Sequence, residues 1–305
     1  MSERILVTGG AGFIGFHLAK RLLDEGYSIC LVDNHARGIL DESLATLLLH
    51  PRVSIVEADM LDRDAVLALG TDYRAIFHLA AIIGVRHVLE RPYDVLIQNT
   101  RMLENVITLA KHQSRFSRLL FASTSEVYAG TLKHFQLSVP TPENTALALT
   151  HLSEPRTSYM LSKIMGESMV HQSGLPFTIF RPHNIYGPRM GMAHVIPEQL
   201  NKAFYANDGD SLQVYSPDHR RAFCYIDDAV EMLRRMLINE ACRGATLNLG
   251  TQTPEVSIRD VVRICIDICG KQLKIEELSS TPGSPERRAP DMQKTNHLIG
   301  FESEI

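Results

Sequence analysis

Tyr159 and Lys163, four residues apart in the segment TSYMLSK, have the types and spacing of a proton-transfer pair. Residues at positions i and i+4 lie on one face of a helix, so the two side chains can act together. A free phenol has a pKa of about 10, and a nearby positive charge favours its phenolate. Tyr159 can then take a proton from an alcohol whose carbon loses hydride. A surface tyrosine beside a solvated lysine has the same spacing, so the prediction depends on other motifs.

Thr124 follows the apolar run RLLFAS, which predicts a buried strand. Ligands of open parallel sheets bind outside the carboxyl ends of the strands, which is where this hydroxyl is expected. We expect Thr124 to hydrogen-bond the oxygen from which Tyr159 removes the proton.

A glycine-rich turn predicts the acceptor of the hydride. The stretch RILVTGGAGFIG runs from a short strand into an amphipathic helix and carries Gly9, Gly12 and Gly15. Gly9 suits the tight turn, Gly12 the approach of a pyrophosphate, and Gly15 the close packing of helix on strand. A second strand, SICLVD, follows the helix, and this complete unit predicts a dinucleotide site.

Asp33 ends that second strand, where a carboxylate can accept hydrogen bonds from both hydroxyls of the adenosine ribose. The same carboxylate repels a 2′-phosphate, which favours NAD over NADP. Arg37 can pair with such a phosphate, so NADP stays an alternative. Asp59 ends the third strand and can bond the adenine edge, although a solvated strand end explains it equally well.

The predicted cofactor-binding residues are Gly9, Gly12, Phe13, Ile14, Gly15, Asp33, Asn34, Asp59, Met60, Leu79, Ala80, Ala81, Asn99, Tyr159 and Lys163.

Composition excludes several classes of partner. The chain has 305 residues, 45% of them hydrophobic, and a net charge of −4 without a Lys/Arg-rich run, so nucleic acid is not expected. The first strand begins near residue 4, and no segment has membrane-spanning length, so we expect a cytoplasmic protein without membrane contact. The five cysteines contain no CxxC pair, and the thirteen histidines lack ligand spacing. Reduced thiols and no metal are therefore expected.

The order of apolar runs predicts the fold. Runs at ILVTG, SICLVD, VSIVEAD, AIFHLAA, RLLFAST and FTIFRPHN alternate with helical periodicity. This alternation is typical of an α/β protein with a Rossmann-like, doubly wound parallel sheet, expected over residues 1–185. Proline and glycine punctuate the chain afterwards and predict a smaller, discontinuous lobe over 186–305, with returns to the sheet near 222–250.

Taken together, the motifs resemble the extended short-chain dehydrogenase/reductase family, in particular its nucleotide-sugar epimerases, dehydratases and decarboxylases. The segments that carry the resemblance are TGGAGFIG, HLAA, STSEVY, SYMLSK, FRPHNIYGPR and RRAFCYIDD. The resemblance implies a nucleotide-sugar substrate, with a UDP-sugar favoured, and a homodimer formed through helices near 95–111 and 158–172. It also implies that four residues contact the diphosphate or sugar: Asn184, Arg189, Arg221 and Arg288.

Members of this family oxidise the sugar at C4, and the next step distinguishes the enzymes. The triplet Thr124-Ser125-Glu126, with GPRM and ERRAPD, looks most like UDP-glucuronate decarboxylases. Arg288 would then orient the carboxylate on C5, and Glu126 would assist proton transfer. The alternatives are a nucleotide-sugar 4-epimerase and, third, a net 4-dehydrogenase. Ser125 disfavours a 4,6-dehydratase, because those enzymes resemble one another in a Thr-Asp-Glu triplet. A non-catalytic NAD-binding sensor is disfavoured because the Tyr159–Lys163 pair is intact.

Overall fold

The computed structural model describes residues 2–135, 137–280 and 285–305. Its largest element is a sheet of seven strands, all paired in parallel. In spatial order the strands are β11 (Ala245–Leu249), β6 (Phe177–Pro182), β5 (Arg118–Ala122), β4 (Tyr73–His78), β1 (Arg4–Thr8), β2 (Ser28–Asp33) and β3 (Val53–Glu57). The chain order reverses between β1 and β4, which is where doubly wound sheets bind their ligands. The Rossmann-like fold predicted from the sequence is confirmed.

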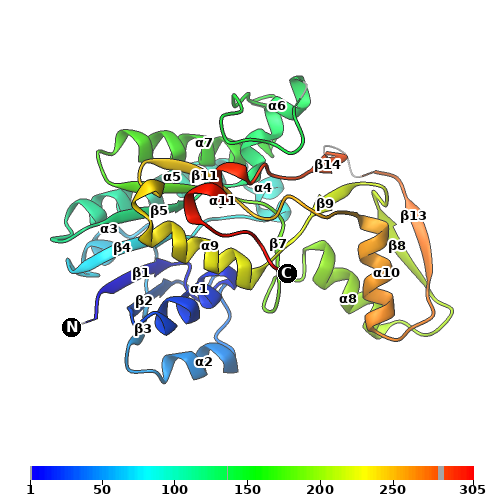
Figure 1. Cartoon of the computed structure of the whole chain (residues 1–305), viewed down its shortest axis with the longest axis horizontal. Helices are drawn as coiled ribbons and strands as arrows, with labels where there is room; N and C mark the ends of the chain where they lie inside the picture. The colour runs from blue at the N-terminus through cyan, green and yellow to red at the C-terminus, as the bar shows by residue number, and fades with distance from the viewer. Residues whose placement is uncertain (1, 136, 281–284) are drawn as a thin grey trace.

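Helices cover both faces of this sheet (Figure 1). One face packs against α1 (Phe13–Asp24), α2 (Glu42–Leu48), α9 (Ile226–Ile238) and α11 (Gln293–Ile299). The other face packs against α3 (Arg63–Leu67), α5 (Pro92–Lys111) and α7 (Thr157–Gln172). The alternation of strand side chains explains both layers, since Ile5 and Val7 enter the first core and Leu6 the second.

A smaller lobe projects from the carboxyl edge of the sheet, to the right in Figure 1. It contains α8 (Val195–Tyr205), β8 (Ser211–Tyr215), α10 (Ile258–Ile268) and β13 (Lys274–Leu278). Strands β8 and β13 pair in parallel, and a separate apolar core that includes Leu212, Val262 and Ile266 joins them to the two helices.

Short ladders connect the lobe to the sheet. Strand β7 (Ile185–Tyr186) pairs with β10 (Cys224–Tyr225), and β9 (Arg220–Ala222) lies between β12 (Glu255–Ser257) and β14 (Arg287–Arg288). The β9–β14 register places Arg221 opposite Arg288. Four short helices complete the chain: α4 (Val85–Glu90), η1 (Ser125–Tyr128), α6 (Ala129–His134) and η2 (Glu240–Cys242).

The later part of the chain returns to the sheet more than once. Helix α9 packs on α1 and strand β11 pairs with β6. Helix α11 also returns, because Met292 and Ile299 belong to the core that contains α1 and α9. In the described part of the chain, no helix is long and apolar enough to cross a membrane. Those residues likewise contain no group of three or more His, Cys, Asp or Glu arranged to hold a metal ion.

Candidate active site

The carboxyl end of β5 presents Thr124 at the start of η1. Its Oγ1 accepts a hydrogen bond from the Glu126 N–H at 3.2 Å, which caps this helical turn. Because the oxygen is the acceptor in that bond, the hydroxyl proton can be donated elsewhere. Hydrogen bonding from the Thr124 side chain lowers the pKa of Tyr159, so the two side chains lie together as expected of groups that serve one substrate oxygen.

Lys163 lies beneath this edge, one turn after Tyr159 on α7. Its Nζ donates to the carbonyl of Ala122 at 2.8 Å and lies 5.0 Å from the ring centroid of Phe121 and 5.9 Å from that of Tyr159. Burial lowers the pKa of Lys163 to about 8, opposed by the negative charge of Glu167. The ammonium therefore keeps its proton at neutral pH and has two further hydrogens to donate.

The pKa of Tyr159 is raised, first because the phenol is buried and second because Glu126 is negative. Its hydrogen bond with Thr124 lowers the pKa, and so does the charge of Arg37. We expected the Lys163 ammonium and the positive nicotinamide of a bound cofactor to favour the phenolate. In the structure the Lys163 ammonium is directed at the Ala122 carbonyl and the Phe121 ring, and Thr124 is the first of the groups that lower the pKa of Tyr159.

Glu126 and Arg288 form an ion pair near Thr124 and Tyr159. Arg288 Nη1 lies 2.8 Å from Glu126 Oε1, and the side chains are 25% and 40% exposed. This guanidinium is the main reason why the pKa of Glu126 is lowered, and Arg156 and Arg221 act in the same direction. The site thus contains an ionised carboxylate surrounded by positive charge, which suits an anionic substrate.

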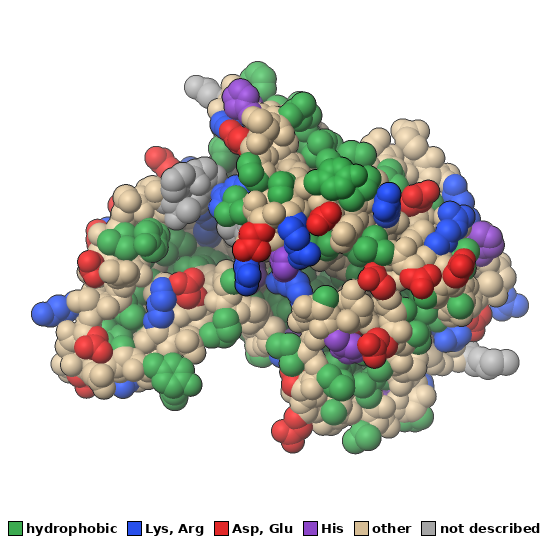
Figure 2. All heavy atoms as spheres, turned by 180° about the vertical axis from the view of Figure 1, so that it is seen from behind, with side chains coloured by type: hydrophobic (Ala, Val, Ile, Leu, Met, Phe, Trp, Pro, Cys, Tyr) green, Lys and Arg blue, Asp and Glu red, His purple; other side chains and the backbone are tan. Residues whose placement is uncertain are grey.

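Arg221 and Asn184 lie further toward the smaller lobe. Burial lowers the pKa of Arg221 to about 10, and its Nη1 and Nη2 donate to the carbonyls of Arg220 at 2.7 Å and Pro285 at 2.8 Å. Asn184 has a φ of +43° and donates to the Ala222 carbonyl at 3.1 Å. Both residues line a cavity of about 330 Å³ together with Val195, Glu198, Gln199, Val214, Tyr215, Ser216, His219, Phe223 and Ile258. Seen from behind, the molecule has a hollow between its two parts, with acidic and basic side chains along it (Figure 2).

The glycine turn has the form that a dinucleotide requires. Gly9 has a φ of +69°, and its N–H bonds the carbonyl of Val32 at 2.8 Å. A Cβ on Gly15 would lie 2.8 Å from Gly10 Cα, so only glycine lets α1 approach this closely. Gly12 is the N-cap of α1, and no side chain caps this helix and no acidic residue occupies its first turn. The N–H groups of that turn, which includes Phe13 and Ile14, therefore suit a diphosphate.

Asp33 sits where the ribose of such a cofactor is expected. Its Oδ2 accepts from the Ala11 N–H at 3.0 Å and its Oδ1 from the His35 N–H at 2.9 Å. Asn34 supports the same turn, because its Oδ1 accepts from the Ala36 N–H at 3.1 Å. Arg37 donates instead to the carbonyl of Ile83 at 3.2 Å, on the side of Tyr159.

Other predicted cofactor residues follow β3 and β4. Asp59 Oδ1 accepts from the Leu61 N–H at 2.9 Å, and the carbonyl of Met60 accepts from Asn105 at 2.9 Å. The N–H of Leu79 donates to the Thr8 carbonyl at 3.2 Å, and that of Ala80 to Thr8 Oγ1 at 3.3 Å.

Asn99 connects the segment after β4 to helix α7, and Ala81 lies half-buried in that segment. The Asn99 Oδ1 accepts from the Ile82 N–H at 2.7 Å, and its Nδ2 donates to Ser162 Oγ at 3.2 Å. The side chain therefore fixes the segment after β4 relative to Lys163, which follows Ser162 on α7.

Arg189 is the predicted substrate residue that lies apart from the Glu126–Arg288 pair. Its Nε lies 2.8 Å from Asp41 Oδ2, and its guanidinium carbon lies 4.2 Å from the ring centroid of Phe16 on α1. These partners belong to the glycine-turn helix and to the loop after β2. Arg189 is thus brought together with the predicted cofactor residues.

A buried ion pair behind the site was not predicted from the sequence. Arg181 donates from Nε to Glu167 Oε1 at 2.8 Å and from Nη2 to Glu167 Oε2 at 2.6 Å, with 5% and 8% of the side chains exposed. Ser123, next to Thr124, also donates to this carboxylate. Glu167 lies one turn after Lys163 on the same helix, and this spacing could have indicated that its side chain faces the site. Its partner Arg181 lies on β6, and no motif near Arg181 indicates the pairing.

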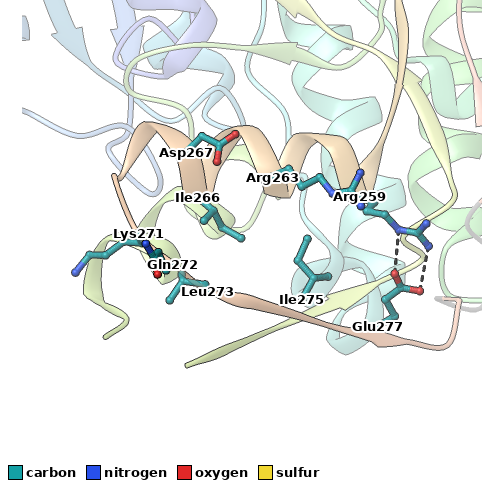
Figure 3. A pocket seen from close by; sticks show the side chains of 9 residues that line it. All are labelled: Arg259, Arg263, Ile266, Asp267, Lys271, Gln272, Leu273, Ile275 and Glu277. Carbon is teal, nitrogen blue, oxygen red and sulfur yellow. Dashed lines mark hydrogen bonds and ion pairs between the residues drawn. The ribbon is translucent and has the colours of Figure 1, made fainter. Parts of the chain in front are cut away.

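A second cavity, of about 540 Å³, opens between α10 and β13 (Figure 3). Ile266 and Ile275 point toward one another across it, and Arg259 pairs with Glu277 at its mouth. It is lined by none of the predicted catalytic or cofactor residues. Its size alone does not make it the active site.

Comparisons with known proteins also indicate an NAD-dependent enzyme that acts on nucleotide sugars. A family model described as the NAD dependent epimerase/dehydratase family matches residues 5–250. The chain is 32% identical over 319 residues to the UDP-N-acetyl-alpha-D-glucosaminuronate decarboxylase of Bacillus cytotoxicus, which covers 100% of this chain and 94% of that protein. It is also 32% identical over 307 residues to UDP-glucuronic acid decarboxylase 1 of Xenopus tropicalis. This match covers 98% of the chain and 68% of that protein. Among solved structures, the chain is similar to UDP-glucuronic acid 4-epimerase from Bacillus cereus in complex with UDP-glucuronic acid and NAD. The TM-score is 0.86 at 25% identity, and the match covers 99% of this chain and 94% of that one.

Proposed function

Because the chain belongs to the NAD dependent epimerase/dehydratase family, we propose that it oxidises a UDP-linked uronic acid at C4 and releases its carboxylate as carbon dioxide. Family membership confirms the NAD-dependent enzyme class expected from the motifs. The observation that carries the specific reaction is the Glu126–Arg288 ion pair beside Tyr159. The 32% identity to two decarboxylases of UDP-linked uronic acids supports the same choice.

The chain's own residues can carry out the proton transfer at O4. Tyr159 removes the proton from O4. Thr124 has a single hydroxyl proton, which it donates to Tyr159 in the free site and would donate to O4 once the sugar is bound. The glycine turn, Asp33 and Lys163 would hold NAD, which supplies the acceptor and later the donor of the C4 hydride.

Once C4 is a ketone, the C5 carboxylate is that of a β-keto acid. The bond from C5 to the carboxyl carbon breaks, carbon dioxide leaves, and the electron pair forms an enolate whose oxygen is O4. Thr124 stabilises the charge on that oxygen. Arg288 orients the carboxylate before it leaves. Glu126 is kept ionised by Arg288, so it is suited to hold the water that protonates C5 rather than to be the acid itself.

The nucleotide is proposed to occupy the 330 Å³ cavity that Asn184 and Arg221 line. Gln199 on α8 supports this placement, since its Oε1 is buried without a hydrogen-bond partner among the described residues and could accept from a base. Arg221 and Arg288, on paired strands, would face the diphosphate and the sugar.

The proposal includes a homodimer that forms through α5 and α7 and works in the cytoplasm. These two helices pack side by side, and Met165 on α7 is 40% exposed. All five cysteines are free thiols, which fits a reducing compartment.

A C4-epimerase is the second candidate, favoured by the match to the UDP-glucuronic acid 4-epimerase at a TM-score of 0.86. Decarboxylation and epimerisation are distinguished by incubating the protein with UDP-glucuronate, its 2-acetamido analogue or UDP-glucose. The products are then analysed by mass spectrometry. Loss of carbon dioxide from the uronates alone is the expected result. An unchanged mass with inverted C4 would mean epimerisation, and stoichiometric NADH would mean net oxidation.

The role of Arg288 is tested by Arg288→Met against Arg287→Met. Arg287 is adjacent in the chain but pairs with Glu255 through a side chain that is 52% exposed, so it serves as a matched control. Arg288→Met should slow carbon dioxide release more than C4 oxidation, and Arg287→Met should affect neither. Equal loss of both steps in Arg288→Met would count against the proposed role.

A further inference from the structure

Arg189 connects two segments that lie 148 residues apart in the chain. It follows β7 and has a φ of +67°, which turns the chain back toward the sheet. Its Nε and Nη2 donate to Asp41 Oδ2 and to the carbonyl of Ile39, both at 2.8 Å. The Arg189 side chain is 12% exposed and that of Asp41 is 34% exposed, so the ion pair is partly shielded from water.

Neighbouring contacts join the same two regions. The carbonyl of Pro188 lies 3.0 Å from His17 Nε2 on α1. The pKa of His194, just before α8, is lowered first by burial and second by the charge of Arg37, in the loop after β2. Residues 187–194 therefore lie against both α1 and the loop 34–41.

The loop 34–41 lies directly over the predicted ribose site. A Cβ on Gly38 would lie 2.8 and 2.9 Å from the two carboxylate oxygens of Asp33. The acidic residue at the end of the second strand is the one that bonds the adenosine ribose in dinucleotide sites. A ribose bound by Asp33 would therefore lie next to this loop.

We propose that Arg189 is a cofactor-retention residue, whose ion pair with Asp41 holds the loop 34–41 closed over the adenosine end of NAD. The inference reassigns Arg189 from the substrate to the cofactor. It depends on NAD as the cofactor and not on the identity of the sugar. In an enzyme that takes its hydride back, slow cofactor release keeps the oxidised sugar and the reduced cofactor together.

Asp41→Asn isolates the ion pair. Asp41 also caps α2, where its Oδ1 accepts from the Leu44 N–H at 2.9 Å, and asparagine caps helices equally well. The substitution therefore removes the charge and preserves the cap. Asp62→Asn is the matched control, because Asp62 caps α3 through the N–H groups of Asp64 and Ala65.

The experiment measures the release of radiolabelled NAD from the loaded protein into excess unlabelled NAD, with no sugar present. Asp41→Asn and Arg189→Gln should each release NAD about five- to tenfold faster, the scale of one typical intramolecular hydrogen bond. The double variant should release it no faster than Arg189→Gln, because both changes break one interaction. Asp62→Asn should match the wild type.

Two results would overturn the inference. Wild-type release rates in both single variants would show that the ion pair does not retain the cofactor. A raised KM for the nucleotide sugar in Arg189→Gln, with unchanged NAD release, would return Arg189 to the substrate site. Neither result depends on whether the sugar is decarboxylated or epimerised.

Discussion

Replacing Thr124 by valine tests whether this hydroxyl lowers the pKa of Tyr159 more than Lys163 does. Valine has nearly the same shape but cannot donate to the phenol. A hydrogen bond to a charged group contributes about 1.5–3 kcal/mol, and one pKa unit corresponds to about 1.4 kcal/mol. The pKa of Tyr159 should therefore rise by about one to two units in Thr124→Val.

This shift has a direct kinetic consequence. Below its pKa, the phenolate fraction falls tenfold for each unit of increase, so C4 oxidation at neutral pH should slow about 10- to 100-fold. The acid limb of kcat/KM should move to higher pH by the same one to two units. The assay is single-turnover nicotinamide absorbance across a pH series.

Thr124→Ser is the control, because serine keeps the hydroxyl that bonds Tyr159 and accepts from the Glu126 N–H. It should retain most of the wild-type rate and an unshifted acid limb. Thermal unfolding of both variants measures the cost of losing the cap separately, which is about 1 kcal/mol for a helix N-cap. If the acid limb of kcat/KM in Thr124→Val lies at the same pH as in the wild type, Thr124 does not lower the pKa of Tyr159.

Three further outcomes follow from the charges around the site. Because the Glu126 carboxylate raises the pKa of Tyr159, Glu126→Gln should move the acid limb of C4 oxidation to lower pH while slowing product formation; an unmoved limb would contradict the coupling. Burial lowers the pKa of Lys163 from 10.5 to about 8, so the folded protein holds fewer protons than the unfolded chain between these values. Relative to Lys163→Met, the wild-type free energy of unfolding should therefore increase as pH rises from about 8 to 10.5, as urea titrations at several pH values would measure. Arg181→Met leaves the buried Glu167 carboxylate without its partner and should cost about 3–5 kcal/mol in urea unfolding, whereas a cost below about 1 kcal/mol would mean that water replaces the guanidinium.

Local patterns were sufficient to predict the parts of the site that depend on short stretches of chain. Gly9 and Gly15 are required by a strand-to-helix turn that a dozen residues define. The parallel sheet then brings the end of β5 next to β4 and β6, and the Thr124–Tyr159 contact follows from that topology.

Long-range polar partners were not predictable in the same way. Nothing near Arg189 indicates Asp41, because their meeting depends on how residues 187–194 fold back onto the loop after β2. The Arg181–Glu167 pair has the same origin, since two common charged residues become partners only when α7 packs on β6. The return of α11 to the sheet depends on Met292 and Ile299, two apolar residues without a distinctive pattern.

The central claim is that this site breaks the bond between C5 and the carboxyl carbon of a UDP-linked uronic acid. The most direct measurement uses UDP-glucuronate labelled at that carbon and follows the label in gas and sugar while NADH absorbance is recorded. We predict that the label appears as carbon dioxide, that the sugar product loses it, and that no net NADH accumulates. Label that stays in a sugar of altered C4 stereochemistry would contradict the claim.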